Sequence, residues 1–193
     1  MISLHPIVLG SQSPRRQNLL KDLGLEFTIR TTNAEEIFPD HLKREEIVEF
    51  LAKQKAELID SSEEEILITS DTIVWINDGL LGKPTSRDHA IEMISKLSNQ
   101  KHEVLTGVCI QKGSDFHVFH DITEVYFREL SQEEIVYYVD KYKPFDKAGS
   151  YGIQEWIGYV GIKKIEGDFF NVMGLPVFKL YDELIRLRLI QLT

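Results

Sequence analysis

Apolar strands and capped helices alternate along this chain, and the alternation limits the possible folds more than any other feature. Residues 7–11 (IVLGS) predict a short strand. Ser13 and Pro14 then have the residue types of an N-cap and a first helical position, and Gly24 is typical of a helix C-terminus. The predicted helix buries a stripe formed by Leu19, Leu20 and Leu23. A strand that runs directly into a helix indicates an α/β architecture.

The same alternation continues to the end of the chain. Residues 44–60 predict a helix whose inner face carries Val48, Leu51 and Leu58. Lys55 lies on that same stripe, so its ammonium must either extend to the surface or point into a cleft. Strand-like segments cover residues 26–32, 66–76, 102–111, 116–128 and 157–165, and further helices cover 86–97, 131–142 and 176–190. We expect an α/β fold with a mixed central sheet flanked by helices.

Length and charge restrict the function classes. The chain has 193 residues, of which 42% are hydrophobic and 27% charged, so we expect one domain over residues 1–193 with a core of its own. The net charge of −9 argues against general binding to nucleic acid or to an anionic membrane, because both need a basic surface. A small anionic ligand stays compatible, provided that a local basic cluster, and a divalent cation with it, offsets the repulsion.

Cysteine and histidine usage points to a reducing compartment and away from zinc. The single Cys109 lies in an apolar run and is interpreted as a small core residue, so no internal disulfide forms. The N-terminus lacks the pattern of a signal peptide, and no stretch approaches the roughly 20 apolar residues of a membrane span. These features predict a cytoplasmic protein. The six histidines are dispersed, at positions 5, 41, 89, 102, 117 and 120, and predict no zinc site.

The start of the first predicted helix is a candidate phosphate site. Helix N-termini offer unpaired backbone N–H groups and the positive end of a dipole. Ser11 and Ser13 add hydroxyl groups, and Arg15 and Arg16 add guanidinium groups that match phosphate oxygens. The alternative is an ordinary capped helix with two solvated arginines, and the spacing alone leaves both open.

Asp71 is the second candidate, because it interrupts an apolar segment between Ile68 and Ile73. A carboxylate in such a place is costly unless it is paired, hydrogen-bonded or bound to metal. It is interpreted as a general base or metal ligand, with a structural carboxylate as the alternative. Glu35 and Glu36 form an acidic pair that suits a metal ligand or a solvated loop.

Two loops complete the set of candidates. Residues 79–84 (GLLGKP) are not a Walker A motif, because only two residues separate the glycines and a proline follows the lysine, yet Lys83 can still reach a phosphate. Residues 146–154 (DKAGSYGIQ) are rich in glycine and small polar residues, which suits either close approach to a ligand or a simple turn.

Taken together, several blocks resemble the Maf nucleotide pyrophosphatases. The similarity starts with LGSQSPRRQNLLKDLGLEF and continues in family order through LAKQKA, SDTIV, LGKP, KLSNQKHEVLTGV, DKAGSYGIQ and GLP, from Leu9 to Pro176. The resemblance implies a house-cleaning hydrolase that cleaves a nucleoside triphosphate into a monophosphate and pyrophosphate. It implies an elongated sheet in two lobes around a cleft, akin to the inosine-triphosphate pyrophosphatases, with a divalent metal (Mg²⁺ or Mn²⁺) and often a homodimer.

The resemblance also implies residue roles. DKAGSYGIQ is similar to the branch that acts on dTTP and UTP, and Asp71 matches the proton acceptor. Arg15, Thr72 and Gln154 match positions that set substrate preference. Ser11, Arg16, Lys55 and Lys83 match the phosphate-binding positions, and Glu36 matches a metal-side carboxylate that would act with Asp71.

One departure bears on the substrate. Glu155 follows Gln154 where the family typically has glycine. On a strand Glu155 would face away from Gln154 and have little effect; otherwise it would narrow the base pocket. Two alternatives to dTTP and UTP hydrolysis stay open. One is the same pyrophosphate-releasing hydrolysis of a modified guanine nucleotide, and the other is a nucleotide-binding regulator of cell division without turnover. The GIQ segment weighs against the first and an intact Asp71 against the second.

Overall fold

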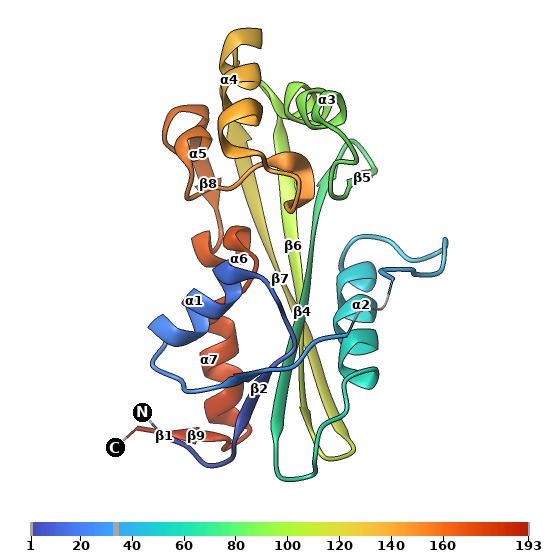
Figure 1. Ribbon diagram of the computed structural model, residues 1–193, viewed down its shortest axis with the longest axis vertical. Coiled ribbons are helices and arrows are strands. Elements are labelled where there is room, and N and C mark those ends of the chain that lie inside the picture. The colour runs from blue at the N-terminus through green and yellow to red at the C-terminus, as the bar shows by residue number, and fades with distance from the viewer. Residues whose placement is uncertain (1, 33–34, 193) are drawn as a thin grey trace. The chain divides into compact units, whose positions relative to one another are not determined.

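The computed structural model describes residues 2–32 and 35–192 and shows a mixed α/β fold (Figure 1). The strands are β1 (Ile2–Ser3), β2 (Ile7–Leu9), β3 (Thr28–Ile29), β4 (Ile66–Ile76), β5 (Gly79–Leu81), β6 (Lys101–Lys112), β7 (Asp115–Phe127), β8 (Ile162–Glu166) and β9 (Ile190–Gln191). The helices are α1 (Pro14–Asp22), α2 (Glu45–Glu57), α3 (Arg87–Leu97), α4 (Gln132–Tyr142), the short 3₁₀ turn η1 (Ala148–Ser150), α5 (Trp156–Gly161), α6 (Phe169–Met173) and α7 (Val177–Arg186).

The predicted mixed sheet is confirmed. Its strand order is β3-β2-β4-β6-β7-β8, and β5 pairs with β4 outside this path. The pairs β2–β3 and β2–β4 are parallel, whereas β4–β5 and β7–β8 are antiparallel. Parallel neighbours need a crossover, and α1 supplies one between β2 and β3. The terminal strands β1 and β9 form a separate antiparallel pair.

The chain forms two compact units. Unit 1 comprises Met1–Asp71, Thr106–Asp121 and Gly174–Thr193, and unit 2 comprises Thr72–Leu105 and Ile122–Met173. Each unit contains part of β4, β6 and β7, so the division falls within these three strands. The prediction of a single domain over residues 1–193 stays a prediction.

In unit 1, helices lie on both sides of the strands, with α1 and α7 on one side and α2 on the other (Figure 1). The contact between α2 and β6 is close, because a Cβ added at Gly107 would lie 2.2 Å from the carbonyl oxygen of Val48. The hydroxyl of Thr69, on β4, donates to the carbonyl of Ala52 at 2.6 Å. These contacts bring the C-terminal half of α2 against the middle of β4, where Asp71 lies.

In unit 2, α3 and α4 pack together over a large apolar core that includes Tyr138, Phe127 and Ile94. Both helices begin as predicted: the Ser86 hydroxyl accepts from the N–H of His89, and Ser131 forms a capping box with Glu134. The guanidinium of Arg87 binds the carboxylate of Asp140 through two nitrogens, at 2.6 and 2.9 Å, and ties α3 to α4.

Three strand predictions were wrong in extent. The strand predicted over residues 7–11 ends at Leu9. The segment 26–32 pairs only at Thr28–Ile29, because its neighbour β2 is itself only three residues long. The segment 157–165 is a strand only from Ile162; its first part is helix α5. The run IGYVG suits either structure by pattern, and packing decides for the helix: Ile157 and Gly161, one helical turn apart, both lie buried near Leu130.

Helix predictions also needed corrections at their ends. Leu58, predicted to face the core, follows the end of α2 and is 54% exposed, and the next residue, Ile59, is buried in its place. The last helix stops at Arg186 because Arg188 has a left-handed backbone (φ 57°), and the chain continues into β9. Ser13 is at the N-cap of α1 but makes no side-chain capping bond.

Candidate functional site

The turn from β2 into α1 is held by Arg16. Its Nε donates to the carbonyl of Gly174 at 2.7 Å, and its Nη1 donates to the carbonyl of Ser70 at 2.9 Å. Nη1 also approaches the hydroxyl of Ser11, at 3.5 Å, and that hydroxyl accepts from the N–H of Ser13. The predicted phosphate-binding pair Ser11 and Arg16 is therefore brought together, and Arg16 also has a structural role that the sequence did not predict.

Arg16 brings a positive charge toward Asp71. Burial lowers the pKa of Arg16, and the nearby carboxylate of Asp71 acts in the opposite direction. The neighbouring Arg15, half-buried in the first turn of α1, adds a second positive charge near Arg16. Unit 1 thus gathers cationic side chains at the end of a helix whose backbone N–H groups already favour anions.

Asp71, Lys55 and Glu36 form a charged cluster in unit 1. The Nζ of Lys55 lies 2.5 Å from Oδ1 of Asp71 and 3.0 Å from Oε1 of Glu36. The Asp71 side chain is only 7% exposed, the Lys55 side chain 17% and the Glu36 side chain 40%. Lys55 therefore points from the inner side of α2 to a buried carboxylate, and its ammonium does not extend to the surface as one alternative required.

The surroundings of Asp71 shift the pKa of its carboxyl group. Burial raises the pKa of Asp71, and the negative charge of Glu36 adds to the rise, while Lys55 and Arg16 oppose it. A carboxylate with a raised pKa accepts a proton more readily than an ordinary aspartate. Asp71 is thus a buried carboxylate that pairs with Lys55 and lies near Arg16, and its role as a general base or metal ligand stays a prediction.

In unit 2, the two candidate loops are joined. The N–H of Gly149 donates to the carbonyl of Gly82 at 3.0 Å, so the loop that carries the exposed Lys83 is fixed to the segment DKAGSYGIQ. Gly149 has φ 67°, and a Cβ there would lie 2.9 Å from Cγ2 of Val74. The glycine is thus required by close packing on β4, which the sequence could not distinguish from close approach to a ligand.

Gln154 lies in a tight turn of unit 2. The N–H of Glu155 donates to the carbonyl of Gly152 at 3.0 Å and closes the four-residue turn 152–155. The side-chain oxygen of Gln154 is buried, and no donor of the described residues reaches it. Glu155 is not on a strand, as one expectation assumed, but is the N-cap residue of α5.

The predicted residues therefore fall into two groups. The larger group lies in unit 1. The smaller group, Thr72, Lys83 and Gln154, lies in unit 2, and Thr72 directly follows Asp71 on β4. The prediction missed Tyr138 and Lys147, which contact Glu155, although the unusual Glu155 was a signal. The residues gathered in unit 1 are Ser11, Arg15, Arg16, Glu36, Lys55 and Asp71.

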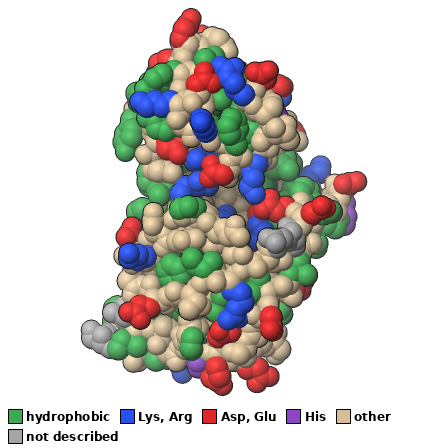
Figure 2. Space-filling view, viewed as in Figure 1, with side chains coloured by type: hydrophobic (Ala, Val, Ile, Leu, Met, Phe, Trp, Pro, Cys, Tyr) green, Lys and Arg blue, Asp and Glu red, His purple; other side chains and the backbone are tan. Residues whose placement is uncertain are grey.

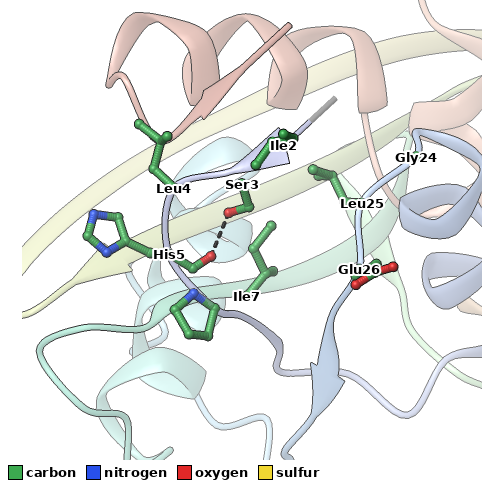
Figure 3. Close-up of a pocket in the computed structure, with 9 residues that line it drawn as sticks. Ile2, Ser3, Leu4, His5, Ile7, Gly24, Leu25 and Glu26 are labelled. Carbon is green, nitrogen blue, oxygen red and sulfur yellow. Dashed lines mark hydrogen bonds between the residues drawn. The ribbon is translucent and has the colours of Figure 1, made fainter. Parts of the chain in front are cut away.

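A separate cavity of about 520 Å³ lies at the N-terminal end of unit 1 (Figure 3). It is lined by residues 2–7 and 24–26, and the hydroxyl of Ser3 donates to the carbonyl of His5 at 2.6 Å within it. None of the predicted site residues is part of its wall. The charged cluster of Asp71, Lys55 and Glu36 is therefore distinct from this cavity.

On the visible face in Figure 2, acidic and basic side chains are interspersed with hydrophobic ones.

Cys109 is buried and has no disulfide partner, and burial raises the pKa of its thiol to about 12, as expected for a core cysteine. No helix in the described part of the chain has the length and apolarity needed to span a membrane.

Comparison with known proteins identifies the family. The family model described as Maf-like protein matches residues 6–187. The chain belongs to the Maf family. This Maf protein is 50% identical over 182 residues to a protein of Flavobacterium johnsoniae named dTTP/UTP pyrophosphatase, and the match covers 93% of this chain and 94% of that relative. A relative of the same name from Cytophaga hutchinsonii is 53% identical, with 92% of this chain and 82% of that protein covered.

A comparison of structures gives a more distant similarity. The Maf protein is similar to a HAM1 protein from Coxiella burnetii, with 16% sequence identity and a TM-score of 0.42. The match covers 64% of this chain and 73% of that one.

Proposed function

We propose that this Maf protein is a nucleoside triphosphate pyrophosphatase that hydrolyses dTTP and UTP to the monophosphate and pyrophosphate. The observation that carries the proposal is the buried Asp71 carboxylate, paired with Lys55 beside Arg16 and Glu36. The names of relatives that are about 50% identical over more than nine-tenths of the chain support the reaction and the substrates.

In the proposed reaction, Asp71 activates a water molecule. The water oxygen attacks the α-phosphorus, the bond from that phosphorus to the bridging oxygen breaks, and pyrophosphate leaves. The proton of the water passes to the Asp71 carboxylate, whose raised pKa favours acceptance. Ser11 and the cations Arg16, Lys55 and Lys83 bind or neutralise the phosphates, which is most of what phosphoryl transfer needs from a protein. Because Arg16 donates two hydrogen bonds to backbone carbonyls, it contributes to phosphate binding as a positive charge at a fixed position.

A divalent cation fits the donor set at Asp71. Within residues 2–32 and 35–192 no group of three or more histidine, cysteine or acidic side chains could hold a metal alone. Glu36 and Asp71 nevertheless converge on one ammonium, and Mg²⁺ is commonly held by one or two carboxylates together with substrate phosphates and water. We therefore assign Glu36 and Asp71 as the residues that would hold Mg²⁺ or Mn²⁺. Such an ion supplies charge neutralisation to the phosphates when bound.

Gln154 suits recognition of the base. A buried acceptor without a donor costs about 1–3 kcal/mol, so the oxygen of Gln154 gains when a ligand supplies an N–H group. The N3–H of uracil and thymine is such a group, and the amide nitrogen of Gln154 can donate to an adjacent base carbonyl. We assign Gln154, together with Arg15 and Thr72, to substrate preference. Guanine offers a similar edge, so a modified guanine nucleotide is the substrate to test against.

The deciding experiment is a nucleotide panel in the presence of Mg²⁺ or Mn²⁺. We expect UTP and dTTP to be the best substrates, with UMP or TMP and pyrophosphate as products on chromatography. Release of a diphosphate and orthophosphate would contradict the assignment, and binding without turnover would favour a regulator. In water enriched in ¹⁸O, the label should enter the monophosphate, because the attack is on the α-phosphorus; label in pyrophosphate would contradict that step.

Two further proposals concern the setting of the enzyme. The single buried thiol of Cys109 suits a reducing compartment, so we propose a cytoplasmic location, which fractionation would test. The Maf family resemblance predicts a homodimer, and light scattering on the purified protein measures the oligomeric state directly.

A further inference from the structure

One phenol in unit 2 contacts both ends of the turn that carries Gln154. The hydroxyl of Tyr138, on α4, accepts a hydrogen bond from the N–H of Gly152 at 3.0 Å. The same hydroxyl donates a short hydrogen bond to Oε2 of Glu155. Gly152 and Glu155 are the first and last residues of the turn, and Gln154 lies between them. Tyr138 therefore fixes the turn from a helix that belongs to the apolar core.

Glu155 is the second residue that holds this turn. Its carboxylate forms an ion pair with the Nζ of Lys147 at 3.2 Å, and the Lys147 side chain is only 10% exposed. A Cβ added at Gly152 would lie 2.9 Å from the Glu155 carboxyl carbon, so the carboxylate lies directly over the turn. The charge of Glu155 is thus balanced, and a side chain at position 152 would displace its carboxylate.

The hydroxyl of Tyr138 is a stable donor. Burial raises the pKa of Tyr138, and the hydrogen bond to Glu155 raises it further, so the phenol stays protonated. Its ring is fully buried and stacks on Tyr142 with the ring centroids 5.1 Å apart. The network begins at Tyr138 on α4 and reaches the turn 152–155. Its three side chains, Tyr138, Glu155 and Lys147, are not among the residues assigned to the reaction.

We propose that Tyr138 and Glu155 are positioning residues that hold Gln154 in place and thereby set the preference of this enzyme for uracil and thymine nucleotides. The inference rests on the proposed function, because Gln154 has to contact the base. It also gives Glu155 a role, because its carboxylate binds Tyr138 and fixes the turn that carries Gln154.

The test compares Tyr138→Phe and Glu155→Ala with the wild type in hydrolysis of UTP, dTTP, CTP and GTP. Losing one hydrogen bond of about 1 kcal/mol corresponds to roughly a 5-fold effect. We expect kcat/KM for UTP and dTTP to fall about 5- to 10-fold through KM, with kcat and the CTP and GTP values within about 2-fold. Glu155→Gln keeps an acceptor for Tyr138 and should retain the wild-type preference. Tyr142→Phe is the matched control, because it removes a neighbouring hydroxyl of the same helix.

A second measurement does not depend on activity. Amide hydrogen exchange should become at least about 5-fold faster at Gly152 in Tyr138→Phe and stay unchanged there in Tyr142→Phe, since the N–H of Gly152 donates to the Tyr138 hydroxyl. Unchanged exchange in Tyr138→Phe overturns the inference. Faster exchange with an unchanged nucleotide preference overturns the role in specificity.

The reference variant Gln154→Ala separates the two proposals. If Gln154→Ala flattens the nucleotide profile but Tyr138→Phe and Glu155→Ala do not, the positioning role is wrong and the proposed function stands. If the wild type shows no preference for UTP and dTTP, the proposed substrate class fails, and the inference fails with it. Circular dichroism and urea unfolding of each variant exclude a loss of fold as the cause.

Discussion

A buried histidine should make this protein sensitive to mild acid. His102, on β6 in unit 2, is 1% exposed, and its Nε2 lies 2.8 Å from the hydroxyl of Tyr151. Phe127 and Tyr151 contact the ring edge to face. Burial lowers the pKa of His102 from 6.5 to about 3, because the charged imidazolium would lose its hydration.

The size and sign of the effect follow from the difference in proton binding. Between pH 6.5 and about 3 the unfolded chain binds a proton at this residue and the folded protein does not, so the free energy of unfolding falls as the pH falls. The loss is about 1.36 kcal/mol per pH unit, which gives about 2 kcal/mol at pH 5 compared with pH 7.5. For a chain of this size we expect Tm to fall by roughly 4–8 °C from this residue alone.

The assay is urea unfolding of the wild type and of His102→Gln at pH 7.5 and pH 5. Both tryptophans, Trp75 and Trp156, lie in unit 2, so their fluorescence reports the unit that contains His102. The wild type should lose about 2 kcal/mol more than His102→Gln on acidification, because all other titrating groups are shared. His41→Gln, which removes an exposed histidine, should behave like the wild type. Equal losses in the wild type and His102→Gln would refute the reasoning.

Three further predictions concern substitutions of Asp71, Lys55 and Gly107. Asp71→Asn should lower kcat by about 10²–10⁴-fold while calorimetry still detects nucleotide binding, since the shape remains and the base is lost; near-normal turnover would assign Asp71 a structural role. Lys55→Met should cost about 3 kcal/mol in urea unfolding near neutral pH, because the buried Asp71 carboxylate loses its ion-pair partner. Adding Asp71→Asn should restore most of that loss, and a double variant as unstable as the single one would contradict the pairing. Gly107→Ala should cost at least about 2 kcal/mol, because its Cβ meets the Val48 carbonyl, whereas Gly79→Ala, with no neighbour closer than 3.4 Å, should cost far less.

Local signals in the sequence were strong enough to predict most elements. The strand over residues 66–76 has the predicted bounds, and the capping box at Ser131 starts α4 where expected. Caps, turns and periodicity act over a few neighbouring residues, so their information is present in the sequence itself. Asp71 was detectable for the same reason, because a lone carboxylate in an apolar strand conflicts with its surroundings.

Tertiary contacts decided what local signals left open. The sequence of IGYVG allowed a strand or a helix, and burial of Ile157 and Gly161 decided for the helix. Arg16 was predicted as a phosphate ligand, but only the fold brings its guanidinium to the carbonyl of Gly174, 158 positions away.

Side-chain partners at long range depend on the whole fold. The ammonium of Lys55 had two possible directions on its helix, and the packing of α2 against β4 brought it to Asp71. Glu155 was visible as an unusual residue, yet its contact with Tyr138 depends on α4 lying beside the turn 152–155. Residue types therefore determined which groups carry charge and which elements form, whereas their pairing required the three-dimensional structure, since such contacts join segments with no local relation in the chain.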